Sequence, residues 1–358
     1  MNVDIYMPRL DVTFKKGPVP QQRQPVSGIR LYWSRFVKHL QHSHISLGDN
    51  VRVVEVPLWQ ITENLVNDLS KKANRIYIPH KMKLNWELDS RILYYMQMVI
   101  PSIFSIDSTG WCASASYWPI SEFAWQESEV TPDIYTNLRN RIATNTSKFA
   151  QPQSNNVTLP SKYILFPCQI PHDETIRYHS DINIFDCLKA LILSISNNPG
   201  TSLVIKGHPA NLRAMEQLRD IYTKSKTNTS SFEKDQLLWV DDISIHTLLS
   251  GCSAVFTVNS GVGLEALLHK KKVYTFGNAD YFSASTKIMF GGSIGNASKA
   301  IDKVLRSELS TYEQSALEQK CRRFINSWYY THFDCDNPQT FKKIKEIHYP
   351  CRLSKQHI

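Results

Sequence analysis

The sequence predicts an α/β protein made of two doubly wound, Rossmann-like domains that face each other across a cleft. Three observations lead to this prediction. The chain has 358 residues, of which 42% are hydrophobic and 20% charged, a globular composition long enough for two domains. Short apolar runs alternate with helical patterns, as in βαβ units. This alternation begins anew after residues 143–161, a polar stretch with the composition of an interdomain linker.

In the first half, residues 75–81 indicate a strand that ends at Pro79-His80. Residues 87–100 are then expected to form a helix capped near Asn85, followed by a strand at 102–107. We assign 1–155 to this N-terminal domain.

The second half predicts a parallel sheet, because short apolar strands alternate with helices. The expected strands are 162–170, 201–209, 237–242, 254–260 and 272–277, and the expected helices are 183–197, 211–224, 244–252 and 261–270. We assign 156–310 to this C-terminal domain. The tail, 311–358, begins as helix and ends in an aromatic, basic stretch, and we expect it to pack back toward the N-terminal domain, with membrane-surface contact as a secondary role.

Charge and cysteine content narrow the class of protein. The formal net charge of +9 at pH 7 favours either an anionic partner or plain solubility. Nucleic acid is the least favoured partner, since basic runs with interleaved aromatic residues are missing. Seven scattered cysteines without a C-x-x-C pair argue against zinc or a disulfide framework. With neither a signal-peptide pattern nor 18 consecutive apolar residues, a cytoplasmic protein is expected.

Polar residues follow three expected strands of the second half at their carboxyl ends, where open α/β sheets bind ligands. They are Gln169, Asp173, Arg177 and His179 after the first, Lys206 and His208 after the second, and Asn259, Ser260, Gly261 and Glu265 after the third. Ser260 at a helix N-terminus suits a phosphate, and Glu265 suits the hydroxyls of a ribose. The alternatives are structural: a hydrogen-bonded turn for His208 and a plain N-cap for Ser260.

The order of these motifs resembles a known family. Q-x-x-x-D at 169–173, K-x-H-P at 206–209 and N-S-x-x-G-x-E-A-L-L at 259–268 are similar to the bacterial capsular polysaccharide biosynthesis glycosyltransferases, especially the retaining β-Kdo transferases that use CMP-β-Kdo. The resemblance covers residues 160–285 clearly. It implies a GT-B-like architecture and transfer of Kdo to a glycan acceptor with retention, in the biosynthesis of a bacterial capsule or lipopolysaccharide.

The resemblance also implies roles for individual residues. Asp173 would form the glycosyl adduct, Asp107 would deprotonate the acceptor hydroxyl, and His208 would donate a hydrogen bond to the leaving phosphate. The sequence departs from the family at His172, which replaces an acid and leaves Glu174 as a substitute nucleophile, and at Gly207, which replaces a proline. Donor binding is expected from Lys206, His208, Asn259, Ser260, Gly261, Glu265, Gln169 and Arg177. No metal or other cofactor is expected, because a CMP-sugar has a single phosphate.

The acceptor, an oligosaccharide or glycolipid, is expected to bind in the N-terminal half. Candidates are Trp111, with Trp118 as a second stacking ring, Ser114 and His80. For Asp107 the alternative is a cap on the turn over Thr109 and Gly110, and for the tryptophans burial in the core.

The expected surroundings are the inner face of the inner membrane, with membership of a larger polymerase or capsule assembly complex as a further option. Three other functions stay open. They are an inverting CMP-sugar transferase of the polysialyltransferase type, a hydrolysing nucleotide-sugar epimerase, and a non-catalytic glycan- or nucleotide-binding module of a capsule assembly complex.

Overall fold

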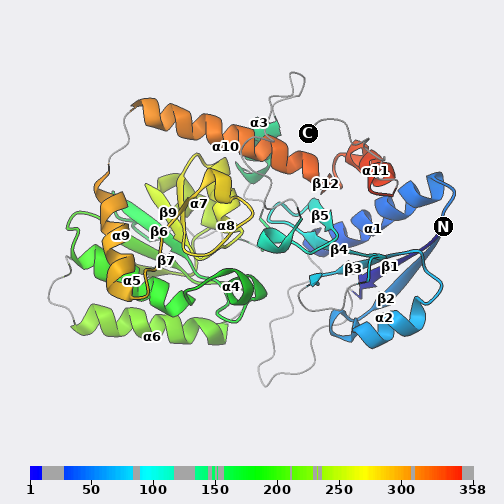
Figure 1. Ribbon diagram of the computed structural model, residues 1–358. Helices are drawn as coiled ribbons and strands as arrows, with labels where there is room; N and C mark the ends of the chain where they lie inside the picture. The colour runs from blue at the N-terminus through cyan, green and yellow to red at the C-terminus, as the bar shows by residue number, and fades with distance from the viewer. Residues whose placement is uncertain are drawn as a thin grey trace, which may run out of the picture. The chain divides into compact units, whose positions relative to one another are not determined.

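The structure is a computed structural model that describes residues 1–9, 28–83, 89–116, 134–143, 147–149, 151, 157–209, 212–228, 232, 236–307 and 311–348. The chain divides into two compact units. Unit 1 combines Met1–Pro119 with Tyr329–Ile358, and unit 2 is Ile120–Trp328. Each unit contains one six-stranded sheet with helices packed against it (Figure 1). The prediction of two Rossmann-like α/β units is confirmed.

Unit 1 contains the sheet β12-β5-β4-β3-β1-β2. Its strands are β1 (Asn2–Pro8), β2 (Asn50–Val56), β3 (Arg75–Pro79), β4 (Ile92–Gln97), β5 (Ile103–Asp107) and β12 (Phe333–Asp334), and its helices are α1 (Gly28–Ser46), α2 (Glu63–Leu69) and α11 (Ile344–His348). Strands β1 to β4 are parallel, whereas β5 and β12 run antiparallel to their neighbours. Short 3-10 turns, Leu58–Gln60, Cys112–Ser114 and Pro338–Lys343, complete the described part of the unit.

The expected helix at 87–100 is wrong, because residues 92–97 form strand β4. All six side chains of β4 are buried. Leu93 and Tyr95 pack into the apolar cluster that contains Phe36 of α1, while Ile92 and Tyr94 pack into the cluster that contains Val66 of α2. A strand buried on both faces lacks the apolar-polar alternation that identifies strands in a sequence. The continuous apolar run of β4 is therefore indistinguishable from a helical pattern in the sequence alone.

The bounds of the units differ from the sequence-based domains at two places. Residues 120–155, which we had assigned to the N-terminal domain, fall in unit 2. In the tail, α10 (Thr311–Thr331) precedes β12, and β12 pairs with β5, so the end of the tail falls in unit 1.

Unit 2 contains the sheet β11-β10-β9-β6-β7-β8, in which all neighbours are parallel. Its strands are β6 (Tyr163–Pro167), β7 (Ser202–Lys206), β8 (Leu237–Val240), β9 (Ala254–Thr257), β10 (Lys272–Thr275) and β11 (Thr286–Lys287). Its helices are α3 (Ile134–Ala143), α4 (Glu174–His179), α5 (Ile184–Ser196), α6 (Leu212–Asn228), α7 (Ile245–Gly251), α8 (Val262–Leu268), α9 (Ile294–Arg306) and α10, with a 3-10 turn at Phe282–Ala284. Helices α5, α6 and α9 lie on one face of the sheet, and α7 and α8 on the other (Figure 1).

The strand order of unit 2 reverses beside β6. From β6 the chain adds β7 and β8 on one side, and then returns to add β9 and β10 on the other. The carboxyl ends of β6 and β9 therefore flank the topological switch point, where open α/β sheets bind ligands. Among the described residues, no helix is long and apolar enough to cross a lipid bilayer.

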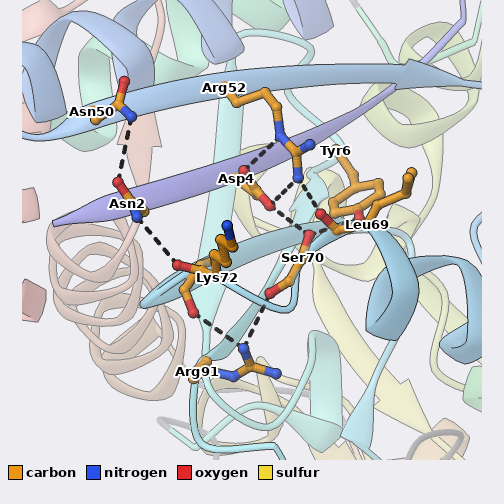
Figure 2. A network of polar contacts seen from close by, with 10 residues as sticks. Asn2, Asp4, Tyr6, Asn50, Arg52, Leu69, Ser70, Lys72 and Arg91 are labelled. Atoms are coloured by element: carbon orange, nitrogen blue, oxygen red, sulfur yellow. Dashed lines mark hydrogen bonds and ion pairs between the residues drawn. The ribbon is translucent and has the colours of Figure 1, made fainter.

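A buried carboxylate joins the first strands of unit 1 (Figure 2). Asp4 on β1 is 5% exposed and accepts hydrogen bonds from Arg52 Nε and Nη2 on the neighbouring strand β2, at 2.9 and 2.6 Å. The hydroxyl of Ser70 also donates to Asp4, at 2.5 Å, and contacts the hydroxyl of Tyr6 at 2.8 Å. Arg91 Nη1 donates to the carbonyl of Ser70. This network ties β1, β2 and the turn after α2 to the segment before β4.

Replacing this carboxylate should destabilise the protein. We expect Asp4→Ala to lower the free energy of unfolding by about 2–3 kcal/mol, because buried Ser70 and the Arg52 guanidinium lose a charged acceptor. Denaturant unfolding of the full chain measures the change. The matched control is Asp68→Ala, an exposed carboxylate whose ion pair with Lys71 is 3.4 Å long, for which less than about 0.5 kcal/mol is expected. Equal losses in the two variants would contradict the structural role of Asp4.

Candidate functional site

The candidate site lies in unit 2, beside the switch point. Gln169 and Asn259 follow β6 and β9 and are both buried. Gln169 Nε2 donates to Asn259 Oδ1 at 3.0 Å, and the backbone N–H of Asn259 donates to Gln169 Oε1 at 3.0 Å. Asn259 Nδ2 also donates to the carbonyl of Thr175 in α4, at 2.8 Å. Both side chains thus hold the loops of the site together, and neither amide points freely at a ligand.

Asp173 caps α4, and its charge acts on His208. Its Oδ1 accepts from the backbone N–H and hydroxyl of Thr175, at 2.9 and 2.7 Å. Burial lowers the pKa of His208 to about 4, although the negative charge of Asp173 raises it and the charges of Lys148 and Lys206 lower it further. The imidazole is therefore neutral at physiological pH, and the predicted nucleophile and the predicted phosphate ligand lie close together.

Lys206, the last residue of β7, is 6% exposed, and its ammonium donates to the backbone carbonyl of Asp241. Burial lowers the pKa of Lys206, while Asp241 and Asp242 raise it. A Cβ on Gly207 would lie 2.2 Å from Asp241 Oδ1, at the end of a side chain. Trp239 and Arg219 donate to the same carboxylate, so any side chain at position 207 would have to displace Asp241 and these contacts.

Two other predicted donor residues have structural contacts of their own. Ser260 Oγ accepts from the N–H of Val262 at 3.2 Å, and its carbonyl accepts from Tyr281 at 2.5 Å. Gly261, and not Ser260, is the N-cap residue of α8, and it makes no side-chain cap bond. The Ser260 hydroxyl contacts the first N–H of the helix from one residue before the cap. Arg177 lies exposed on α4, with its guanidinium 6.0 Å from the ring centre of Tyr178.

Glu265 in α8 is 2% exposed, and burial raises its pKa to about 7. Its Oε1 accepts from the hydroxyl of Ser147 at 2.7 Å and lies 3.9 Å from His246 Nε2. His246 Nδ1 is 3.2 Å from His269 Nε2, and burial, with a smaller effect of His246, lowers the pKa of His269 to about 4. The Ser147 hydroxyl is thus hydrogen-bonded to one of the two Glu265 oxygens that were expected to accept the ribose hydroxyls.

The structure adds a segment that the sequence did not point to. Residues 147–149 and 151, which we had placed in a linker, contact the site residues of unit 2. Besides the Ser147 bond to Glu265, the ring of Phe149 lies 5.1 Å from that of His208 at 73°. Gln151 Oε1 accepts from the N–H of Ile245 at 2.9 Å. The one available signal was compositional, since Lys148 and Phe149 are the basic and the aromatic residue of an otherwise polar tract.

The acceptor-side candidates gather in unit 1. His80, in a left-handed conformation with φ of 56°, stacks on Trp33 at 5.6 Å and approaches Trp111 edge-on at 6.3 Å. Trp111 is 8% exposed, and its indole N–H has no hydrogen-bond partner among the described residues. Ser114 Oγ donates to Met82 Sδ at 3.3 Å. Trp118 lies outside the described residues.

Asp107 is fully engaged by its own loop. Its Oδ1 accepts from the N–H groups of Thr109, Gly110 and Ser116 and from the hydroxyl of Thr109, at 2.7 to 3.2 Å. Its Oδ2 accepts from the hydroxyl of Ser116 at 2.6 Å. This geometry is that of the turn-capping alternative.

Comparison with known proteins finds a family model that matches part of the chain. Residues 129–285 match the family described as capsule polysaccharide biosynthesis protein, and this range contains every donor-side candidate. A curated relative is the capsule polysaccharide export protein KpsS of Escherichia coli, 34% identical over 126 residues, which are 34% of this chain and 32% of KpsS. Protein FixF of Sinorhizobium fredii is 25% identical over 158 residues, covering 44% of this chain and 36% of FixF.

These alignments span about a third of the length of the curated relatives. Among solved structures, the β-Kdo 2,7 transferase of Thermosulfurimonas dismutans KpsC is similar with a TM-score of 0.49 and 16% identity, over 84% of this chain and 89% of that chain. The capsule-family segment coincides with the central sheet of unit 2, so the family assignment and the candidate site concern the same part of the molecule.

The buried carboxyl of Glu265 should make stability depend on pH. Its folded pKa of about 7 lies above the ordinary value of 4.5, so the folded state binds the extra proton between these values and stability falls as the pH rises through them. Glu265→Gln cannot lose that proton. Relative to wild type, the variant should gain about 2–3 kcal/mol between pH 4.5 and 7.5.

Denaturant unfolding at several pH values measures this difference. Glu216→Gln, an exposed carboxyl on α6, serves as the control and should follow the wild-type curve. If Glu265→Gln follows it as well, the carboxyl of Glu265 is not held protonated by the fold.

Proposed function

We propose that this chain is a glycosyltransferase that transfers Kdo from CMP-β-Kdo to a glycan acceptor with retention of configuration, in the synthesis of a bacterial capsule or lipopolysaccharide. The observation that carries the proposal is that Asp173 and His208 follow the neighbouring strands β6 and β7 at the carboxyl edge of the unit 2 sheet, where the charge of Asp173 acts on the imidazole. Both lie in the segment of the capsule polysaccharide biosynthesis family, in the motif order that resembles the β-Kdo transferases.

In this proposal, His208 binds the phosphate of the donor. A neutral imidazole has one N–H, which donates to a phosphate oxygen and stabilises the charge that develops on CMP as it leaves. The nearby charges of Lys148 and Lys206 favour the same anion. A single phosphate and the sugar carboxylate are matched here by cations and N–H donors, so we propose that the reaction needs no metal ion.

Asp173 would be the nucleophile. Retention requires two displacements, in which a carboxylate oxygen first bonds to the anomeric carbon while the bond from that carbon to the CMP phosphate breaks. The acceptor oxygen then displaces the carboxylate. Thr175 holds Oδ1 of Asp173 through two hydrogen bonds, which orients the carboxylate before the donor arrives. Glu174, one residue further on, is the alternative nucleophile.

Asp107 can act as the general base only if one of its present hydrogen bonds is released. The Ser116 hydroxyl at Oδ2 occupies the position that an acceptor hydroxyl would need, and it has to give way before Asp107 can take a proton. His80 and Trp111 offer aromatic surface for the acceptor sugar, and the free indole N–H of Trp111 suits a hydroxyl or carboxylate. The proposed acceptor is a glycolipid or oligosaccharide at the inner face of the membrane.

A donor panel tests the proposal. CMP-Kdo, CMP-sialic acid, UDP-sugars and GDP-sugars are compared by thermal shift and by turnover, with and without EDTA. We expect CMP-Kdo alone to be turned over, with EDTA having no effect. His208→Ala should reduce kcat/KM about 10²- to 10³-fold, the usual loss for one oriented donor. Strict dependence on magnesium, or wild-type kcat/KM in His208→Ala, would contradict the assignment of the phosphate site.

A covalent adduct is the sharpest test of the mechanism. Asp173→Asn should still cap α4, because asparagine is as good an N-cap as aspartate, and it should keep CMP binding while turnover falls by several orders of magnitude. Asp107→Asn should accumulate an adduct on residues 162–182, seen by intact-mass and peptide mass spectrometry after incubation with CMP-Kdo. An adduct on Glu174 would move the nucleophile by one residue. Wild-type turnover by Asp173→Asn, or an inverted product anomer by NMR, would favour a single displacement instead.

A further inference from the structure

Three contacts fasten one short piece of chain to the donor-side elements. We call residues 147–149 and 151 the bridging segment. At one end Ser147 Oγ donates to Glu265 of α8, and at the other Gln151 accepts from the N–H of Ile245 at the start of α7. Between them, Phe149 contacts His208 after β7. The contacted residues lie on three different elements of unit 2. Hydrogen bonds at Ser147 and Gln151 therefore hold the segment on either side of Phe149, which contacts His208.

Phe149 restricts the imidazole of His208. The rings meet at 73° with their centres 5.1 Å apart, a T-shaped geometry that aromatic pairs favour. The backbone N–H of His208 is meanwhile 3.2 Å from Met215 Sδ. With the backbone and the ring both held, the direction of the imidazole N–H is set before a ligand binds.

Lys148 brings a positive charge to the same place. It lies close enough for its charge to lower the pKa of His208, as Lys206 also does. The ammonium of Lys206 already donates to the Asp241 carbonyl and lies near the Asp241 and Asp242 carboxylates. Lys148 and Lys206 therefore both place positive charge near an anion bound at His208.

We propose that the bridging segment is part of the donor-binding site, in which Lys148 binds an anionic group of the donor and Phe149 positions His208 against it. The identity of that anion as the phosphate of CMP rests on the proposed function. The contacts of the bridging segment do not depend on it. Because Ser147 and Gln151 anchor the segment on either side, Lys148 and Phe149 lose little conformational freedom when the anion binds, which raises affinity.

Calorimetric titration of the full chain with CMP tests the inference. Lys148→Ala and Phe149→Ala should each weaken CMP binding about tenfold or somewhat less. Lys148→Arg and Phe149→Tyr should restore most of the affinity, because the charge and the aromatic edge return. Lys148→Ala should also bind CMP with a weaker dependence on salt. The matched control is Lys162→Ala, an exposed lysine before β6 at the opposite end of the sheet, which should bind as wild type does.

A second measurement follows His208 directly. In histidine NMR, with the His208 signal assigned through His208→Gln, the pKa of His208 should rise from about 4 toward its ordinary value in Phe149→Ala, because the ring loses its cover. It should rise less in Lys148→Ala, and not at all in Lys162→Ala. A role of Phe149 in folding alone would leave this pKa unchanged in the folded variant.

The outcomes separate this inference from the proposed function. If wild type binds CMP and both alanine variants bind it equally well, the bridging segment is not part of the site. If wild type does not bind CMP, the proposed function fails. Inorganic phosphate in the same titration then tests Lys148, and the pKa of His208 tests Phe149. Unchanged phosphate affinity and an unchanged pKa would overturn the inference in that case as well.

Discussion

The amide pair of Gln169 and Asn259 is the constraint on which the rest of the candidate site depends. At the switch point the ladder between β6 and β9 ends at Leu165 and Val255, and no later ladder pair joins the two loops among the described residues. Two reciprocal hydrogen bonds, each 3.0 Å long, join them in a buried setting where an unsatisfied amide would be costly. Through Asn259 the restraint extends to Thr175, and Thr175 holds the carboxylate of Asp173. This chain of hydrogen bonds fixes the position of the proposed nucleophile, Asp173, relative to the sheet.

Burial around the site controls which groups are charged. His208 is neutral because the surrounding protein excludes water, despite the favourable carboxylate of Asp173. Glu265 is held toward its neutral form for the same reason. The charges that act on His208 in this setting are those of Asp173, Lys148 and Lys206. In surroundings of low dielectric constant, an incoming anion interacts with those charges more strongly than it would in water.

Unit 1 has its polar groups arranged for a different purpose. The Asp4 network and the loop around Asp107 both satisfy a carboxylate completely, the first between strands and the second within a turn. Such carboxylates stabilise the fold and leave little room for a ligand. The exception is the aromatic group of His80, Trp33 and Trp111, in which His80 has a left-handed backbone and the indole N–H of Trp111 has no partner among the described residues. Backbone strain and an unsatisfied buried donor both cost stability, and such features are commonly associated with binding.

The sequence by itself determined five strands of the parallel sheet of unit 2, β6 to β10, because each is a short apolar run bounded by polar or turn-forming residues. The sixth strand, β11, is an exposed Thr-Lys pair without that pattern. The sequence also placed Gln169, Asp173, His208 and Asn259 at strand ends, and parallel strands bring such ends to one edge of a sheet. Only the tertiary structure decided that residues 92–97 are a strand, since burial on both faces removes the alternation that a sequence displays. The contacts of the bridging segment could not be predicted from the sequence either. Ser147 and Glu265 are 118 residues apart, and their hydrogen bond exists only once the segment is folded against α8.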